Sequence, residues 1–171
     1  MTEQTIAAIA TAIGEAGIGI VRLSGSQALE IAEQMFVTKR GDSPKNLPGY
    51  TARYGRGIDP QEQRTIDEAI LLVMRGPYSY TGEDVVEFQC HGGVVVVQRV
   101  LEIALRLGAH LAEAGEFTKR AFLNGRLDLS QAEAVIDVIR SRTDESLAVA
   151  IDQLEGSLSR RIGTIREQLY D

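Results

Sequence analysis

Short apolar runs, separated by glycine, proline and charged residues, dominate the first two thirds of the chain. The runs at residues 5–10 and 18–23 are rich in β-branched side chains and predict two strands. Apolar positions then recur at helical spacing over residues 27–36, and the stretch 39–49, with its glycines and prolines, predicts a loop. The chain is therefore expected to begin with two strands and a helix.

The middle of the chain continues with strands. Two runs, at residues 50–58 and 66–74, flank a turn built on an aspartate and a proline, which favours an antiparallel hairpin. A further strand near residues 84–90 leads through two glycines into a helix that ends before Gly108. This pattern predicts an α+β domain over residues 1–118, with a mixed or antiparallel sheet covered by helices.

After this domain the periodicity is helical throughout. Residues 115–139 predict two short helices joined by a polar turn, where an Asn-Gly pair ends the first helix and either Asp128 or Ser130 caps the second. Arg126 lies between the two helices. On spacing alone, an ordinary helical corner with a solvated arginine explains this turn.

From Ser141 onward one long helical pattern reaches the last residues. Its apolar positions recur at spacings of four and three, as in the seam of a helical bundle. We expect no other part of the sequence to cover the whole seam, so residues 119–171 are expected to be the first part of an incomplete bundle. The seam consists of Leu147, Ile151, Leu154, Leu158, Ile162, Ile165 and Leu169.

Composition and charge narrow the class of protein. The 171 residues are 44% hydrophobic and carry a formal net charge of −6. Neither part of the chain, divided at Thr118, has an excess of basic residues, so a protein that grips RNA by itself is not expected. Arg160, Arg161 and Arg166 form either a local basic patch or a solvated helix face.

The sequence also bears on the compartment and on metal binding. Cys90 is the single cysteine, which excludes an internal disulfide and fits a reducing compartment, and two histidines are too few for a zinc site. The first residues carry Glu3 and Glu15 without an early basic residue, unlike a signal peptide, and no run approaches transmembrane length. We therefore expect a cytoplasmic protein without a membrane partner.

The strand before the two glycines has two different faces. Val86, Phe88 and Cys90 share one face, and Glu87 lies on the other. A polar face on a half-buried strand and a ligand-binding carboxylate explain Glu87 equally well. Cys90 and His91 cannot form a catalytic dyad, because neighbouring strand residues point to opposite sides.

Nucleotide-binding motifs are missing from the sequence. A phosphate-binding loop needs G-x-x-x-x-G-K-[ST], and no Gly-Lys pair occurs anywhere. Gly17-x-Gly19 is followed by Arg22 where a dinucleotide fingerprint needs a third glycine. This chain alone is therefore expected neither to bind GTP tightly nor to hydrolyse it.

Three segments together resemble a known family. They read GIGIVRLSG at residues 17–25, GPYSYTGEDVVEFQCHGG at residues 76–93 and GEFTKRAFLNGRLDLSQAEAVIDVI at residues 115–139. In this order they resemble the bacterial tRNA-modification GTPase family MnmE, also called TrmE, from Thr5 to the last residues. The stretch 11–17, TAIGEAG, lacks the paired prolines and the basic residue that relatives often carry there, so no ligand contact is carried over to it.

The resemblance implies a folate-binding function for the first domain. In the family this domain is similar to the folate-binding domains of aminomethyltransferases and binds 5-formyltetrahydrofolate. By motif position, the cofactor-binding residues are Arg22, Glu87 and Arg126, with no catalytic residue and no metal ligand in this part. A carboxylate can accept the adjacent N–H donors of a pterin, and arginine complements its carbonyl or glutamate carboxylates.

The resemblance also implies partners and absent parts. The family forms homodimers and works with an MnmG-type FAD-dependent flavoprotein to place an aminomethyl-type group on C5 of the tRNA wobble uridine. Its GTPase domain, which uses GTP, magnesium and potassium, and the later part of its helical domain are not in this sequence. Two alternatives remain: a ligand-free dimerisation scaffold and a folate-dependent aminomethyltransferase relative.

Overall fold

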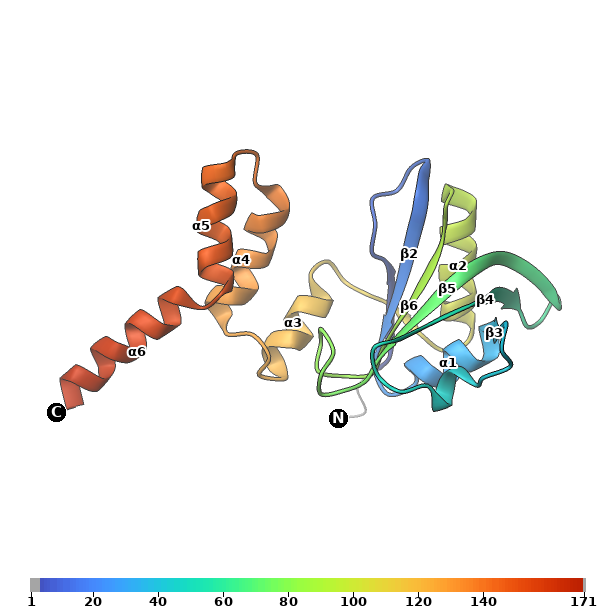
Figure 1. The fold of residues 1–171 in the computed structure, drawn as a ribbon, viewed down its shortest axis with the longest axis horizontal. Helices are drawn as coiled ribbons and strands as arrows, with labels where there is room; N and C mark the ends of the chain where they lie inside the picture. The colour runs from blue at the N-terminus through green and yellow to red at the C-terminus, as the bar shows by residue number, and fades with distance from the viewer. Residues whose placement is uncertain (1–3, 171) are drawn as a thin grey trace. The chain divides into compact units, whose positions relative to one another are not determined.

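The computed structural model describes residues 4–170. The chain forms two compact units, Met1–Ala114 and Gly115–Asp171, most of whose elements are labelled in Figure 1. Within residues 4–170, no helix is long and apolar enough to cross a membrane.

The first unit is built on one seven-stranded sheet with the strand order β3-β4-β5-β6-β2-β1-β7. Neighbouring strands are antiparallel, except that β1 and β7 are parallel. The strands are β1 (Ile6–Ile9), β2 (Ala16–Ser24), β3 (Phe36–Thr38), β4 (Thr51–Asp59), β5 (Arg64–Met74), β6 (Val85–Gly92) and β7 (His110–Leu111). With helices added, this mixed sheet confirms the α+β class expected from the sequence.

Two helices and a short 3-10 turn complete this unit. They are α1 (Ala28–Met35), η1 (Pro44–Asn46) and α2 (Val94–Arg106). Both helices pack on the same face of the sheet, because their buried residues join one core with alternate strand residues, Val86, Phe88 and Cys90 of β6 among them. The rings of Phe36 and Phe88 meet edge to face, with centroids 6.1 Å apart.

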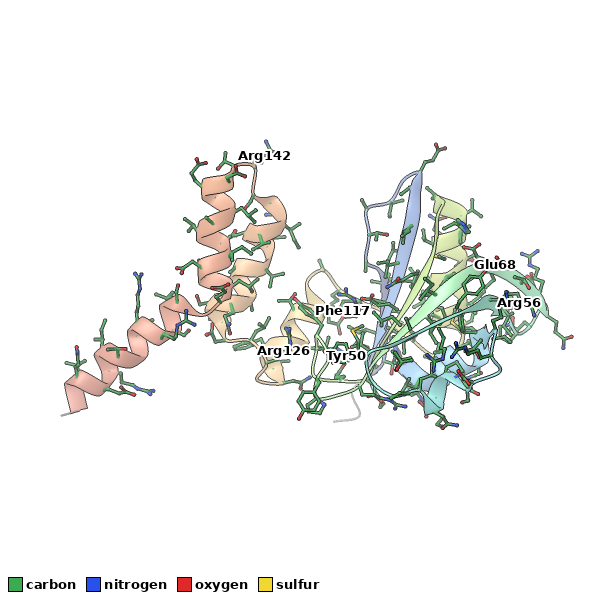
Figure 2. All side chains as sticks on the ribbon, in the orientation of Figure 1. Tyr50, Arg56, Glu68, Phe117, Arg126 and Arg142 are labelled. Carbon is green, nitrogen blue, oxygen red and sulfur yellow. The ribbon has the colours of Figure 1, made fainter. Side chains whose placement is uncertain are left out.

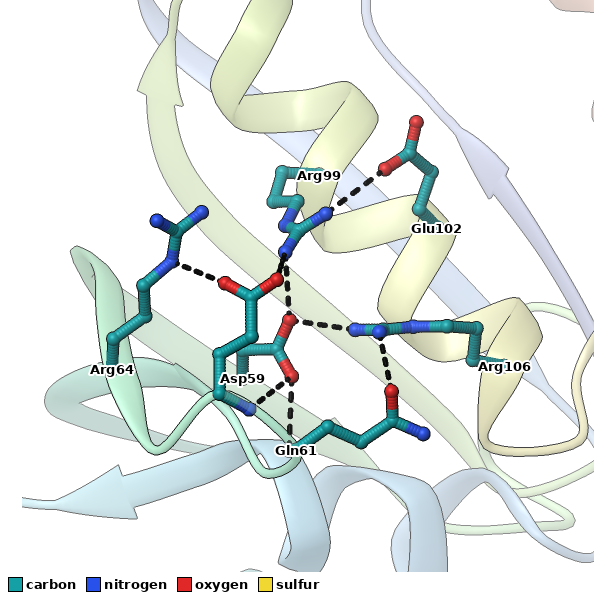
Figure 3. Close-up of polar contacts among 7 residues, drawn as sticks. Asp59, Gln61, Arg64, Arg99, Glu102 and Arg106 are labelled. Atoms are coloured by element: carbon teal, nitrogen blue, oxygen red, sulfur yellow. Dashed lines mark hydrogen bonds and ion pairs between the residues drawn. The ribbon is translucent and has the colours of Figure 1, made fainter.

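The hairpin β4–β5 confirms the turn expected between residues 58 and 66, and a buried aspartate organises it. The Asp59 carboxylate is completely buried and accepts hydrogen bonds from the amides of Gln61 and Glu62. Arg99 and Arg106 reach it from α2, at 3.0 Å and 2.6 Å (Figure 3). One carboxylate therefore holds both the turn and the helix that covers the sheet.

The second unit consists of helices. They are α3 (Glu116–Leu123), α4 (Leu129–Arg140), α5 (Asp144–Leu154) and α6 (Ser157–Tyr170). Asp128 forms a capping box with Gln131 at the start of α4, and Thr143 does the same with Ser146 at the start of α5. Asp128, one of the two cap candidates in the sequence, is thus the N-cap of α4, and the capping prediction is confirmed.

The expectation of one long helix after Ser141 is wrong. The pattern is divided into α5 and α6, with Gly156 between them at φ +80°. The side chain of Gln131 donates a hydrogen bond of 2.8 Å to the carbonyl of Leu154, in the last turn of α5. Glycine adopts this left-handed backbone without strain, and the capped carbonyl satisfies the helix end, so the apolar spacing continues while the helix does not.

Candidate functional site

The face of the sheet away from α1 and α2 carries the residues that the sequence singled out. On β6, alternation directs Glu87 and Gln89 to this face, since Val86 and Phe88 lie in the core. The register pairs Glu87 with Arg22 of β2 on one side and with Leu72 of β5 on the other. Residues directly opposite on neighbouring strands lie close enough for their side chains to interact.

Arg22 and Glu87 form an ion pair at this position. The Arg22 Nε donates to Glu87 Oε1 at 2.8 Å. Glu87 is 7% exposed, which places its carboxylate at the floor of the face and not on its rim. A buried carboxylate needs a charged or hydrogen-bonding partner, and Arg22 supplies one.

The Glu87 carboxylate has acceptor capacity left over. Among residues 4–170, its hydrogen bond from Arg22 uses Oε1 only, and no described residue donates to Oε2. An ionised carboxylate offers about four lone-pair positions. The floor of this site can therefore accept further N–H donors from a ligand.

A loop between β5 and β6 contributes residues that the sequence interpretation did not assign to the site. The Arg22 guanidinium carbon lies 5.6 Å from the centroid of the Tyr80 ring. The Ser24 hydroxyl, at the end of β2, lies 2.7 Å from that of Thr81 and donates to Glu83 at 2.6 Å. The only sequence signal for these contacts was the motif SYTGED itself, because contacts across 57 residues have no local signature.

Arg126 belongs to the second unit. It lies in the turn between α3 and α4 (Figure 2), after Gly125, whose φ is +72°. The Arg126 amide donates to the carbonyl of Ala121 at 2.9 Å, which fixes the backbone of the turn. The structure thus brings Arg22 and Glu87 together within the first unit, and the association of Arg126 with them stays a prediction.

Cys90 and His91 do not act together, as strand alternation predicted. Cys90 is buried, its Sγ donates to the Gly19 carbonyl, and burial, followed by the charge of Asp67, raises the pKa of the thiol to about 11. The His91 Nδ1 lies 2.8 Å from Asp67 Oδ1. A buried thiol of high pKa is not a nucleophile at neutral pH.

The same face of the sheet exposes apolar side chains beside the C-terminal half of β6, beyond Glu87. An open hollow of about 300 Å³ is lined there by Ile18, Tyr54, Ile70, Gln89 and others. Ile18 is 62% exposed and Ile70 is 41% exposed. Neighbouring exposed apolar groups on a sheet face are typical of an interaction surface.

Comparison with known families gives two matches that together span almost the whole chain. Residues 5–126 match the family described as GTP-binding protein TrmE N-terminus. Residues 129–171 match the family described as MnmE helical domain. The junction between the two matches falls beside Arg126, in the turn between α3 and α4.

Curated relatives are similar over the same length, and each is named tRNA modification GTPase MnmE. The protein of Symbiobacterium thermophilum is 61% identical over 171 residues, and that of Carboxydothermus hydrogenoformans is 53% identical over 171 residues. The protein of Geobacillus kaustophilus is 55% identical over 172 residues. All of this chain is covered in each comparison, and the chain spans 37% of the length of each relative.

Proposed function

This chain belongs to the MnmE family of tRNA modification GTPases, comprising its N-terminal and helical domains, and we propose that it binds a reduced folate and pairs with a second copy of itself. The ligand class is a tetrahydrofolate that carries one carbon, such as 5-formyltetrahydrofolate. Arg22 and Glu87 form the floor of the proposed site, and Arg126 is its third proposed contact.

The observation that carries this proposal is the Glu87 carboxylate, whose Oε1 accepts from Arg22 while no described residue donates to Oε2. A pterin presents adjacent N–H donors on the edge of its pyrimidine ring, and these match a carboxylate with an acceptor oxygen to spare. Arg22 holds the carboxylate in place through its Nε bond of 2.8 Å. Burial of Glu87 strengthens a hydrogen bond to a ligand, because little water competes there.

The arginines fit the other polar groups of the same ligand. A reduced folate carries carbonyl oxygens and, at its far end, the carboxylates of glutamate, all of which accept hydrogen bonds. Guanidinium groups bind such acceptors in a planar, often bidentate geometry. Arg126 lies in a turn whose backbone is fixed by the Asp128 capping box and by the hydrogen bond that the Arg126 amide donates to the Ala121 carbonyl, so its side chain starts from a defined position.

For the parent protein we propose the reaction that its family implies. The folate supplies the carbon for an aminomethyl-type group on C5 of the wobble uridine of tRNA, and the flavoprotein partner is of the MnmG type with bound FAD. GTP hydrolysis, with magnesium and potassium, belongs to a domain that has the G-x-x-x-x-G-K-[ST] motif. That motif does not occur in the 171 residues of this chain.

Pairing with a second copy is supported by the exposed apolar side chains of the sheet face. Ile18, Ile70 and Tyr54 lie there on three different strands, and each is at least 41% exposed. A two-fold axis that places the same surface of both copies in contact is the commonest way to bury such a patch. The proposed dimer therefore uses the first unit.

A second candidate function is a dimerisation scaffold without a ligand. The ion pair favours it in one respect, since Arg22 and Glu87 neutralise each other without help from a ligand. The two candidates differ in a direct measurement. Titration of the chain with 5-formyltetrahydrofolate should give saturable heat with a stoichiometry of one per chain, whereas a scaffold should give none up to millimolar ligand.

A further inference from the structure

The guanidinium of Arg22 is held on two sides. Its Nε donates to Glu87 at 2.8 Å, and the ring of Tyr80 lies 5.6 Å from its central carbon. A cation within about 6 Å of an aromatic centroid is attracted by the negative face of the ring. Tyr80 therefore contributes to the position of Arg22, although it belongs to a loop and not to the sheet.

The loop that carries Tyr80 is fastened to the strand that carries Arg22. On either side of Tyr80, the hydroxyls of Ser79 and Thr81 are buried, and Thr81 pairs with Ser24 at 2.7 Å. Glu83 accepts a hydrogen bond from the same Ser24 hydroxyl at 2.6 Å. Ser24 is two residues from Arg22 on β2, so the same strand carries Arg22 and holds the loop of Tyr80.

The two ends of the loop are also closed on each other. The Gly76 amide donates to Asp84 Oδ1 at 3.0 Å, and Arg75 pairs with the other oxygen of Asp84 at 3.3 Å. A Cβ on Gly76 would lie only 2.7 Å from the carbonyl oxygen of Gly82, so glycine is required for this approach. These contacts hold the two ends of the loop together, and they fix the backbone that carries Tyr80.

From these contacts we propose that Tyr80 is a positioning residue of the ligand site, which holds the Arg22 guanidinium in the orientation that Glu87 and the ligand require. The proposal rests on the proposed folate function, because it concerns the residue that orients one of the two groups at the floor of that site.

The Arg22 side chain is long and flexible, and 28% of it is exposed. Ordering such a side chain costs conformational entropy when a ligand binds. A ring packed against the guanidinium restricts the side chain before the ligand arrives, which increases affinity.

The loop provides a matched control. Tyr78 lies two residues before Tyr80 and is 77% exposed. Its backbone carbonyl accepts a hydrogen bond from the hydroxyl of Tyr50, a contact that does not depend on the Tyr78 side chain. Replacing the Tyr78 ring therefore changes the same loop without changing the partner of Arg22.

The experiment compares Tyr80→Leu, Tyr80→Phe and Tyr78→Leu by titration with 5-formyltetrahydrofolate. Tyr80→Leu should weaken binding about three- to tenfold, because a cation–π contact is lost, and Tyr80→Phe should stay within about twofold of wild type. Tyr78→Leu should also stay within about twofold. If circular dichroism shows that Tyr80→Leu does not fold, Tyr80→Met takes its place with the same expectation.

Two further measurements separate positioning from general stability. In an Arg22→Gln background, which has no cation to lie against the ring, Tyr80→Leu should cost much less than it does in wild type, because the two effects are coupled. Without ligand, the Arg22 Nε–Hε signal in proton–nitrogen spectra should exchange slowly with water in wild type and Tyr80→Phe, and rapidly in Tyr80→Leu.

The results distinguish a failure of the positioning role of Tyr80 from a failure of the folate site. Additive effects of the two substitutions, or unchanged affinity in Tyr80→Leu, would overturn the positioning role and leave the folate site standing. If wild type takes up no folate, the proposed function fails, and the exchange of the Arg22 signal alone decides whether Tyr80 orients Arg22. A slow signal in Tyr80→Leu would then overturn the proposal.

Discussion

Glu87 shows how one strand position acquires a specific chemical role. Strand alternation directs its side chain away from the core, and the strand register places Arg22 opposite it. Because Glu87 is buried, little water weakens the ion pair between them. The sequence alone could reach the first of these steps, since alternation is local. It could not reach the second, because the pairing joins residues 65 positions apart.

Asp59 is a buried carboxylate with a structural role. Burial alone would raise its pKa, but hydrogen bonds from Arg106 and from the amides of Gln61 and Glu62 outweigh burial and hold the pKa below its ordinary value. A depressed pKa means that the charged form stabilises the folded chain above the ordinary pKa of an aspartate, and that this stabilisation is lost as the pH falls towards the folded value.

Asp59→Asn should therefore lower the melting temperature by roughly 5 °C or more at pH 7, because Arg99 and Arg106 lose their common acceptor. The difference from wild type should shrink as the pH is lowered below the ordinary pKa of an aspartate. Thermal unfolding of both proteins followed by circular dichroism checks this, with Glu102→Gln as a control for an exposed carboxylate on α2. A difference that stayed constant over this range would show that the charge of Asp59 is not the stabilising feature.

Cys90 should be unreactive in the folded protein. Burial is the main reason that its pKa is raised to about 11, so the thiolate is scarce at pH 8 and access to the sulfur is closed. A thiol reagent such as iodoacetamide should label Cys90 at least tenfold more slowly in buffer than in denaturant. Equal rates in the two conditions would place Cys90 outside the core.

Among the helices and strands, those marked by local turn or capping residues follow from the sequence, whereas very short strands and a helix break that involves a distant residue do not. The hairpin β4–β5 and the cap of α4 follow from turn and capping residues close together in sequence, and both were predicted. The short strands β3 and β7 have only 3 and 2 residues, too few for a periodic pattern to show. The break at Gly156 depends on Gln131, 23 positions before the carbonyl that it caps.

The N-cap residue Asp128, at the start of α4, offers a direct test of whether capping stabilises the helical unit. Asp128 Oδ1 accepts from the amide of Gln131 at 2.8 Å, and Oδ2 accepts from the hydroxyl of Ser159 on α6. Asp128→Ala should destabilise the chain by about 1–2 kcal/mol, since it removes an N-cap. The measurement is the urea midpoint at pH 7.

Ser130→Ala is the matched control for that substitution. The Ser130 hydroxyl is buried and has no hydrogen-bond partner within residues 4–170, so its removal should cost less than about 0.5 kcal/mol. The Ser130 carbonyl, which accepts from Gln153, is unaffected by the change. If Ser130→Ala destabilised as much as Asp128→Ala, packing and not capping would hold this corner.

At the scale of the molecule, the two units divide the proposed tasks. The sheet unit carries the exposed apolar face and the Arg22–Glu87 pair, and the helical unit carries Arg126 in the turn between α3 and α4. Fold class and family could be inferred from periodicity and motifs. The loop contacts of Tyr80 could not, because a motif identifies a segment without stating what its side chains touch.

Self-association should depend on the sheet unit. Sedimentation equilibrium at micromolar concentration should give a dimer both for the full chain and after deletion of residues 141–171. Ile70→Asp should shift either protein towards monomer, since a charge in a buried apolar contact is costly. If the shortened chain were a monomer, the helical seam would be the interface instead.

The most direct test of the account is the affinity of Glu87 variants for 5-formyltetrahydrofolate. Removing one partner of a buried charged hydrogen bond costs about 2–5 kcal/mol, so Glu87→Ala should weaken binding more than tenfold. Glu87→Gln should be nearly as damaging, because an amide loses the charge and keeps one acceptor oxygen. Lys119→Ala, which changes a charge that has no role in the three motifs, should have little effect.

Calorimetric titration of these variants at fixed salt, with circular dichroism to confirm folding, provides the comparison. Wild type and Lys119→Ala should bind the ligand saturably, and both Glu87 variants should lose more than tenfold in affinity. Wild-type affinity in folded Glu87→Ala, or no saturable heat from wild type at millimolar ligand, would contradict the folate site and leave the scaffold as the function of this chain.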